Sequence, residues 1–143
     1  MIIQVISAII AVYFSAIVFE APKKLLPYIA FIGGGGWLIY LLILQYFDIS
    51  IATYLSGLAI AFSSHIAARQ FKAPVTVFFI PGFFPLVPGA GMYKTVYWYI
   101  TGDSLQSQAN LNQTMVIAGM IALAIFTVDS LFRLVSILKH LKK

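Results

Sequence analysis

The chain has no cysteine, and only 9% of its 143 residues are charged. Without cysteine it has no disulfide framework and no thiolate metal site. Its nine Lys and Arg outnumber four Asp and Glu, but the cations are scattered between apolar runs, so the net charge of +5 does not indicate a nucleic-acid partner. Also missing are a nucleophile beside a base, paired carboxylates, a phosphate loop and an HExxH zinc motif. We therefore expect no enzyme, no cofactor and no metal site.

Hydrophobic residues are abundant instead. They make up 62% of the chain, against about 45–50% in an average soluble domain. The apolar runs are too long for a soluble core of this size to bury, which is typical of an integral membrane protein. They are also too long and too uniformly apolar for barrel strands. The sequence therefore predicts an all-α membrane bundle that forms one domain, residues 1–143.

The apolar runs predict about five transmembrane helices. Positive charge follows the first run and does not precede it, so we expect a retained helix and not a cleaved signal peptide. Cytoplasmic connections carry an excess of Lys and Arg. The successive connections carry two, none, two and none, and the C-terminal end carries four. This alternation predicts a multi-pass protein of the cell membrane with its N-terminus outside and its C-terminus in the cytoplasm. The expected spans are residues 2–19, 25–47, 51–68, 74–100 and 114–138.

The fourth run contains a concentration of helix breakers. Residues 74–94 read PVTVFFIPGFFPLVPGAGMYK. Proline cannot donate to the carbonyl four residues earlier, so three prolines are expected to free carbonyls on one face. In lipid such carbonyls must face protein or a watery cavity, and broken helices of this kind indicate a transport site. A kink satisfied by neighbouring helices is the alternative. The prolines are Pro81, Pro85 and Pro88, and the carbonyls belong to Val77, Pro81 and Phe84.

Glycines follow the last of these prolines. Gly89 and Gly91 predict a flexible break with exposed N–H groups, followed by a second half-helix that begins near Met92. The N-terminus of a half-helix carries partial positive charge and can hold a carboxylate. Lys94 lies among tyrosines and a tryptophan, a composition that is typical of an aromatic belt at the outer interface. The segment therefore predicts a carboxylate-binding site built from backbone groups.

This segment resembles the signature of the threonine/serine exporter (ThrE) family. The resemblance is carried by Pro74, Pro81, residues 85–89 (PLVPG) and Tyr93, and the apolar layout agrees over essentially the whole chain. It resembles in particular the short subunits of split exporters, which look like the C-terminal half of fused ones. It implies export of small amino acids driven by the proton gradient, with relatives linked to dicarboxylates, and a larger partner subunit. By position, the resemblance assigns the functional core to Pro81, Pro85, Pro88, Gly89 and Tyr93.

Asp129 and Arg133 are the charged residues of the fifth run. Their i, i+4 spacing allows them to pair on one helix face. Asp129 lies about 15 Å from Lys139 along the helix. An acid at that depth indicates a proton carrier or part of a polar path, whereas an ion pair that merely neutralises both side chains is the alternative. His65, at the end of the third run, is expected to be an interface residue.

Gly33–Gly36 interrupt the second run, and each glycine weakens a helix by roughly 1 kcal/mol relative to alanine. A close helix crossing is favoured over a flexible point. Taken together, the sequence predicts a membrane subunit of a small-solute exporter, acting on threonine and serine with a larger partner. A non-transporting scaffold subunit, an exporter of another small carboxylate such as a dicarboxylate, and a homo-oligomer remain alternatives.

Overall fold

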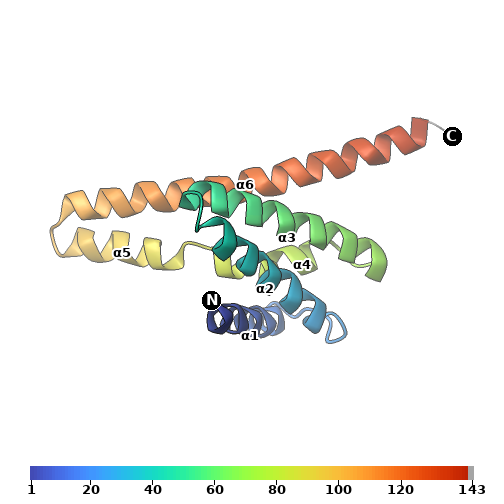
Figure 1. Ribbon diagram of the computed structural model, residues 1–143, viewed down its shortest axis with the longest axis horizontal. Coiled ribbons are helices and arrows are strands. Elements are labelled where there is room, and N and C mark those ends of the chain that lie inside the picture. The colour runs from blue at the N-terminus through green and yellow to red at the C-terminus, as the bar shows by residue number, and fades with distance from the viewer. Residues whose placement is uncertain (142–143) are drawn as a thin grey trace.

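The computed structural model describes residues 1–141, with side chains as far as residue 138. Over this range the chain forms six α-helices, one 3-10 helix and no strand (Figure 1). The all-α prediction is therefore confirmed. Lys142 and Lys143 of the expected basic tail lie outside the described residues. The elements are α1 (Ile2–Val18), α2 (Leu26–Ile43), α3 (Ile49–Phe71), α4 (Thr76–Gly82), η1 (Phe84–Leu86), α5 (Gly89–Ile100) and α6 (Ser104–Leu141).

Within residues 1–141, three helices are long and apolar enough to cross a membrane: α2, α3 and α6. A fourth crossing is added when α4 and η1 are taken together with α5, across a bend of 51°. The structure thus supports three or four spans, fewer than the five expected. The expected span that is not counted in either case is α1. Its 17 residues extend for about 26 Å, slightly less than a hydrocarbon core of about 30 Å.

The last helix begins earlier than expected. Residues 101–113 were expected to connect two spans, but the connection is only a turn, and α6 starts at Ser104. Gly102 turns the chain at a φ of +86°, and the carboxylate of Asp103 accepts the Gln106 N–H at 3.0 Å, which caps the helix. At 38 residues α6 is about 57 Å long. It pairs with α5 in a hairpin that projects beyond the other helices (Figure 1).

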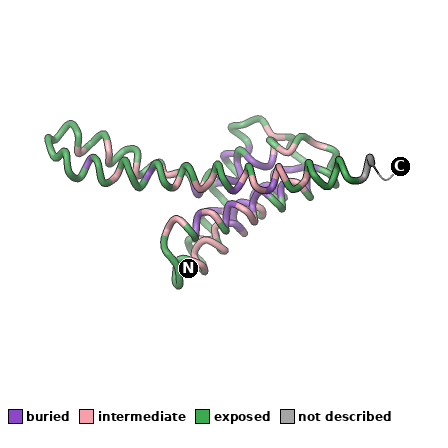
Figure 2. Tube along the Cα trace, turned by 90° about the horizontal axis from the view of Figure 1, so that it is seen from above, coloured by how far each residue is buried: buried purple, intermediate pink, exposed green. Residues whose placement is uncertain are grey.

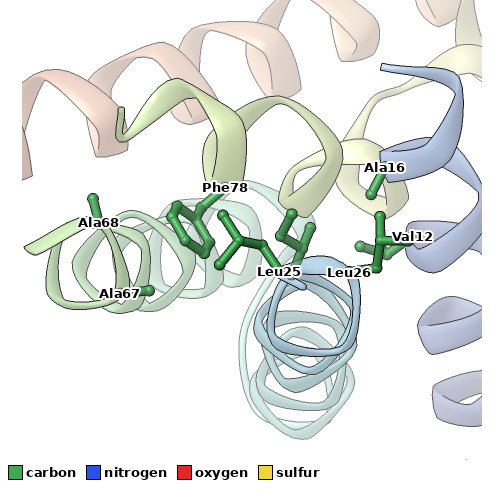
Figure 3. Close-up of a cluster of buried hydrophobic side chains, with 8 residues drawn as sticks. Val12, Ala16, Leu25, Leu26, Ala67, Ala68 and Phe78 are labelled. Carbon is green, nitrogen blue, oxygen red and sulfur yellow. The ribbon is translucent and has the colours of Figure 1, made fainter. Parts of the chain in front are cut away.

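Buried residues gather where the first four helices cross, whereas the α5–α6 hairpin is mostly exposed (Figure 2). Phe78 of α4 is fully buried, and its ring lies against a cluster drawn from α1, α2 and α3 (Figure 3). A second cluster joins α3, α4 and η1 to α6. The first cluster contains Val12, Ala16, Leu25, Leu26, Ile29, Ala67, Ala68 and Phe78, and the second contains Ile60, Ala61, Phe79, Phe83, Leu86 and Val128.

The glycine run is a close crossing, as the sequence predicts. A Cβ atom on Gly33 would lie 2.9 Å from the Gly82 carbonyl oxygen and 2.7 Å from a Val12 methyl group. Added Cβ atoms on Gly34 and Gly36 would run into isoleucine side chains of α1 and α3. The helix itself continues through all four glycines. The run therefore lets α1, α3 and α4 pack directly against the backbone of α2.

Candidate functional site

The last three prolines of the fourth run occupy distinct positions in the chain break. Pro81 lies inside α4, which ends one residue later. Pro85 lies in the first turn of η1, and Pro88 is the N-cap of α5. Val87 is extended (φ −61°, ψ 126°), as expected for a residue whose helical conformation would clash with the ring of the following proline. The prolines therefore end one helix and start another.

The backbone groups at this break are only partly available. The Phe84 carbonyl accepts the Val87 N–H at 3.3 Å, and the Pro81 carbonyl accepts a backbone N–H at the end of α4, so the prediction that these two carbonyls are free was wrong. The Gly89 N–H is also occupied, because it donates to the Val87 carbonyl at 2.8 Å. Within the described residues, the N–H groups of Ala90 and Gly91 have no acceptor. The free donors at the start of α5 are therefore those of the second and third residues.

A cavity of about 250 Å³ opens beside these donors, between α2, α3, η1, α5 and α6, and we call it the break cavity. Among the predicted site residues, Pro85, Pro88 and Gly91 line it, whereas Pro81 and Gly89 do not. Tyr93 is 70% exposed and stacks on Tyr97 instead. The polar and aromatic lining that the sequence analysis missed consists of Trp37, Tyr40, Thr53, Lys94, Asn110, Gln113 and Thr114.

Thr114 is the distinctive side chain of the break cavity. Its Oγ1 is buried and has no hydrogen-bond partner within the described residues. Gly91 is what brings α5 so close, because a Cβ there would collide with this hydroxyl oxygen. A buried hydroxyl without a partner destabilises a protein by about 1–3 kcal/mol, so an unpaired one calls for an explanation such as a bound solute or water. The sequence analysis did not single it out, because Thr114 is simply the first residue of the expected span 114–138.

A second cavity, of about 360 Å³, lies between α3, α4 and α6, and we call it the pair cavity. In it, His65 Nε2 lies 2.6 Å from Asp129 Oδ1. The alternative of an intrahelical ion pair was wrong, because Arg133 forms no ion pair with Asp129 in the described structure. Arg133 instead lines the same cavity as Asp129. The structure thus brings together His65 and Asp129, which the sequence analysis did not connect.

Aromatic rings fix the position of the imidazole. The ring of His65 stacks on Phe132, with centroids 4.3 Å apart and planes at 8°. Phe79 of α4 meets it edge-on at 5.6 Å. The guanidinium of Arg69 also lies over Phe132, 4.5 Å from its centroid. The imidazole is therefore clamped between α4 and α6, with Nε2 directed at the carboxylate.

The two cavities border the same apolar cluster. Leu86 lines the break cavity and Phe79 lines the pair cavity, and both belong to the second core cluster. Phe83 lies between them in the chain, and its ring meets that of Phe79 at 5.9 Å, edge to face. Each cavity therefore combines polar lining residues with an apolar one, and these two apolar residues, Leu86 and Phe79, belong to one core cluster.

The helices and their composition define an all-helical membrane protein with polar cavities beside a broken apolar segment. Residues 4–131 match the family described as "Threonine/Serine exporter, ThrE". The match covers most of the chain, so the chain belongs to the threonine/serine exporter family, and the resemblance found in the sequence is confirmed. Comparison with curated proteins and with solved structures gives no match.

Proposed function

We propose that the chain is the membrane subunit of a threonine/serine exporter that is driven by the proton gradient and works with a larger partner subunit. Family membership supports the substrate class. The observation that carries the binding site is the buried hydroxyl of Thr114, which faces a cavity at the start of a half-helix and has no partner in the described structure. A substrate hydroxyl or ammonium group would supply that partner.

The substrate carboxylate would bind at the start of α5. The N–H groups of Ala90 and Gly91 are free donors there, and the helix N-terminus favours an anion. Lys94, one turn later in the helix, adds a full positive charge to the same cavity. Asn110 and Gln113 line it from α6 and can bind the polar groups of the solute. Pro81, Pro85, Pro88 and Gly89 act here by shaping the break, and Tyr93 acts outside the cavity.

In this proposal the chain crosses the membrane five times, with α4, η1 and α5 as a broken fourth span. In Figure 1 the α1–α2 connection, the end of α3 and the end of α6 lie toward one end of the molecule, and the α2–α3 connection lies toward the other. The first of these ends carries Lys23, Lys24, Arg69 and Lys72. The positive end would be cytoplasmic, and the N-terminus would lie outside.

The partner is proposed to bind along α6. In the most apolar stretch of this helix only 11% of the residues are buried within the chain, against 39% in α3. Such a surface can face lipid or another protein. The same exposed helix favours the alternative of a scaffold subunit that stabilises a partner and transports nothing itself. A dicarboxylate is the alternative substrate, since backbone amides and a lysine bind any carboxylate.

Efflux of labelled threonine and serine tests the proposal. Cells that lack their own exporters would express this chain alone, the larger subunit alone, or both together. We expect efflux with both, and a strong loss of it with Thr114→Val. Efflux of labelled succinate in place of the amino acids would favour the dicarboxylate alternative. An absence of flux for all three solutes, with both proteins inserted, would favour the scaffold.

A further inference from the structure

The pair cavity combines charges of both signs around one opening. Arg69 of α3 and Arg133 of α6 are exposed at its walls, and Asp129 contributes the carboxylate. Thr76 and Ser136 add hydroxyl groups. A free α-amino acid carries a carboxylate and an ammonium group, and threonine and serine add a hydroxyl. The cavity therefore offers a partner of the right kind to each polar group of a hydroxy amino acid.

The carboxylate of Asp129 can reach a solute. The side chain of Asp129 is 37% exposed, whereas that of its partner His65 is 13% exposed. Only Oδ1 is engaged by the imidazole, and within residues 1–138 the other carboxylate oxygen has no hydrogen-bond partner. The histidine is therefore the inner member of the pair, and the carboxylate is the member that borders the open space.

We propose that the pair cavity is a second binding site for a zwitterionic amino acid, in which its ammonium group and a proton on His65 compete for Asp129. The substrate carboxylate lies between Arg69 and Arg133. This inference rests on the proposed function, because it assigns the site at which the exporter exchanges solute for proton.

The competition follows from charge. A protonated imidazole beside Asp129 neutralises the carboxylate and adds positive charge to a cavity that already holds Arg69 and Arg133. The lining from α4 and the residue before it, Val75, Thr76 and Phe79, carries no titratable group that could compensate. A neutral imidazole leaves the carboxylate charged and able to hold an ammonium. The bound proton and the bound amino acid therefore exclude each other.

Mutual exclusion at one carboxylate is what an exchanger requires. A site that releases its proton when the amino acid binds, and the reverse, carries the two in opposite directions when its access alternates between the two sides of the membrane. Histidine suits this role because its imidazole exists in a charged and a neutral form that differ by one proton. The stacked contact of His65 with Phe132 and its edge-on contact with Phe79 hold Nε2 toward Asp129.

The test is ¹⁵N NMR of the imidazole in the full chain, held in lipid nanodiscs at pH 6.5. His140 is replaced by glutamine, so that His65 is the only histidine. We expect L-threonine at ten times its dissociation constant to lower the imidazolium fraction about threefold or more. The matched probe 3-hydroxybutyrate has the carboxylate and hydroxyl but no ammonium, and it should not lower that fraction.

Two variants sharpen the result. Asp129→Asn should abolish the effect of threonine on the imidazole, and Asp48→Asn, an acid in the α2–α3 connection, should leave it unchanged. The inference is overturned if threonine leaves the imidazolium fraction of the otherwise unaltered chain unchanged, or if 3-hydroxybutyrate lowers it equally. That outcome, together with threonine efflux in cells, would reject the exchange site but keep the exporter. An absence of efflux would reject the exporter whatever the imidazole does.

Discussion

The imidazole Nε2 of His65 and the carboxylate Oδ1 of Asp129 lie 2.6 Å apart and join helices α3 and α6 across 64 residues of sequence. The two helices also share the hydrogen bond between Tyr54 Oη and Thr127 Oγ1, at 3.2 Å. Gly57 allows a close approach of the same two helices, because a Cβ there would lie 2.8 Å from that of Ala124. The α3–α6 interface is therefore held by two polar pairs and a small-residue contact.

The first prediction concerns the energy of the His65–Asp129 pair. A double-mutant cycle with His65→Ala and Asp129→Ala should give a coupling energy of about 0.5–2 kcal/mol, because the pair is partly buried and hydrogen-bonded. Unfolding of the purified chain in detergent would measure it. The hydrogen bond between Tyr54 and Thr127, removed by Tyr54→Phe and Thr127→Val, is the uncharged control between the same helices. Strictly additive effects at His65 and Asp129 would contradict the pairing.

The second prediction separates stability from binding at Thr114. Thr114→Val removes a buried hydroxyl that has no partner in the described structure, so it should raise the free energy of unfolding by up to about 2 kcal/mol. The same change should weaken threonine binding about tenfold or more, because the substrate loses its partner. Thermal unfolding and labelled-threonine binding give the two readouts.

The matched control for Thr114 is Thr53, which lines the same cavity. Its hydroxyl already donates to the Ile49 carbonyl at 2.7 Å, so Thr53→Val should bring no gain in stability. A variant at Thr114 that became less stable would show that the hydroxyl has a partner in the folded chain. Unchanged threonine binding by that variant would remove Thr114 from the site.

The helices of the fold were predictable from sequence wherever the length of an apolar run determines them. Long runs without charge predict helices whatever their neighbours, and the glycine run favours a close crossing over a flexible point. The start of α6 was missed because Ser, Gln and Asn in residues 104–113 carry no apolar signal. That stretch is helical because Asp103 caps it and because the Ser107 hydroxyl donates to the Thr95 carbonyl of α5 at 2.9 Å.

The site was predictable only in part, because backbone breaks leave a mark in the sequence and tertiary pairings do not. The prolines and glycines of the fourth run locate the break cavity. They do not reveal which N–H groups are free, since the Val87 carbonyl occupies that of Gly89. Asp129 stands out as a lone acid in an apolar run, but its partner His65 lies on another helix. Spacing along one helix suggested Arg133 instead.

The third prediction uses two neighbouring glycines of α2. Gly33→Ala should lower the free energy of unfolding by about 1–3 kcal/mol, because its Cβ would meet the Gly82 carbonyl and Val12. Gly35→Ala meets nothing within 4 Å and should stabilise the helix by up to about 1 kcal/mol. Thermal unfolding of the two variants side by side checks this. Equal effects at both positions would mean that α2 does not cross its neighbours as closely as described.

The fourth prediction concerns the proposed orientation, and the absence of cysteine makes it directly measurable. Single cysteines replace Lys24, Tyr46 or Leu105, of which the last two are 81% and 84% exposed. A membrane-impermeant maleimide added to intact cells should label the cysteines at 46 and 105. The cysteine at 24 should react only after the membrane is opened. The unaltered chain, which has no thiol, is the background control.

Labelling at positions 46 and 105 together shows whether the broken segment of α4, η1 and α5 crosses the membrane. After position 46 the chain passes through α3 and then through the bent segment of α4, η1 and α5, so a segment that crosses returns position 105 to the side of position 46. A re-entrant loop would instead leave position 105 on the side of Lys24. Labelling of 46 without 105 on intact cells would therefore replace the broken span by a re-entrant loop.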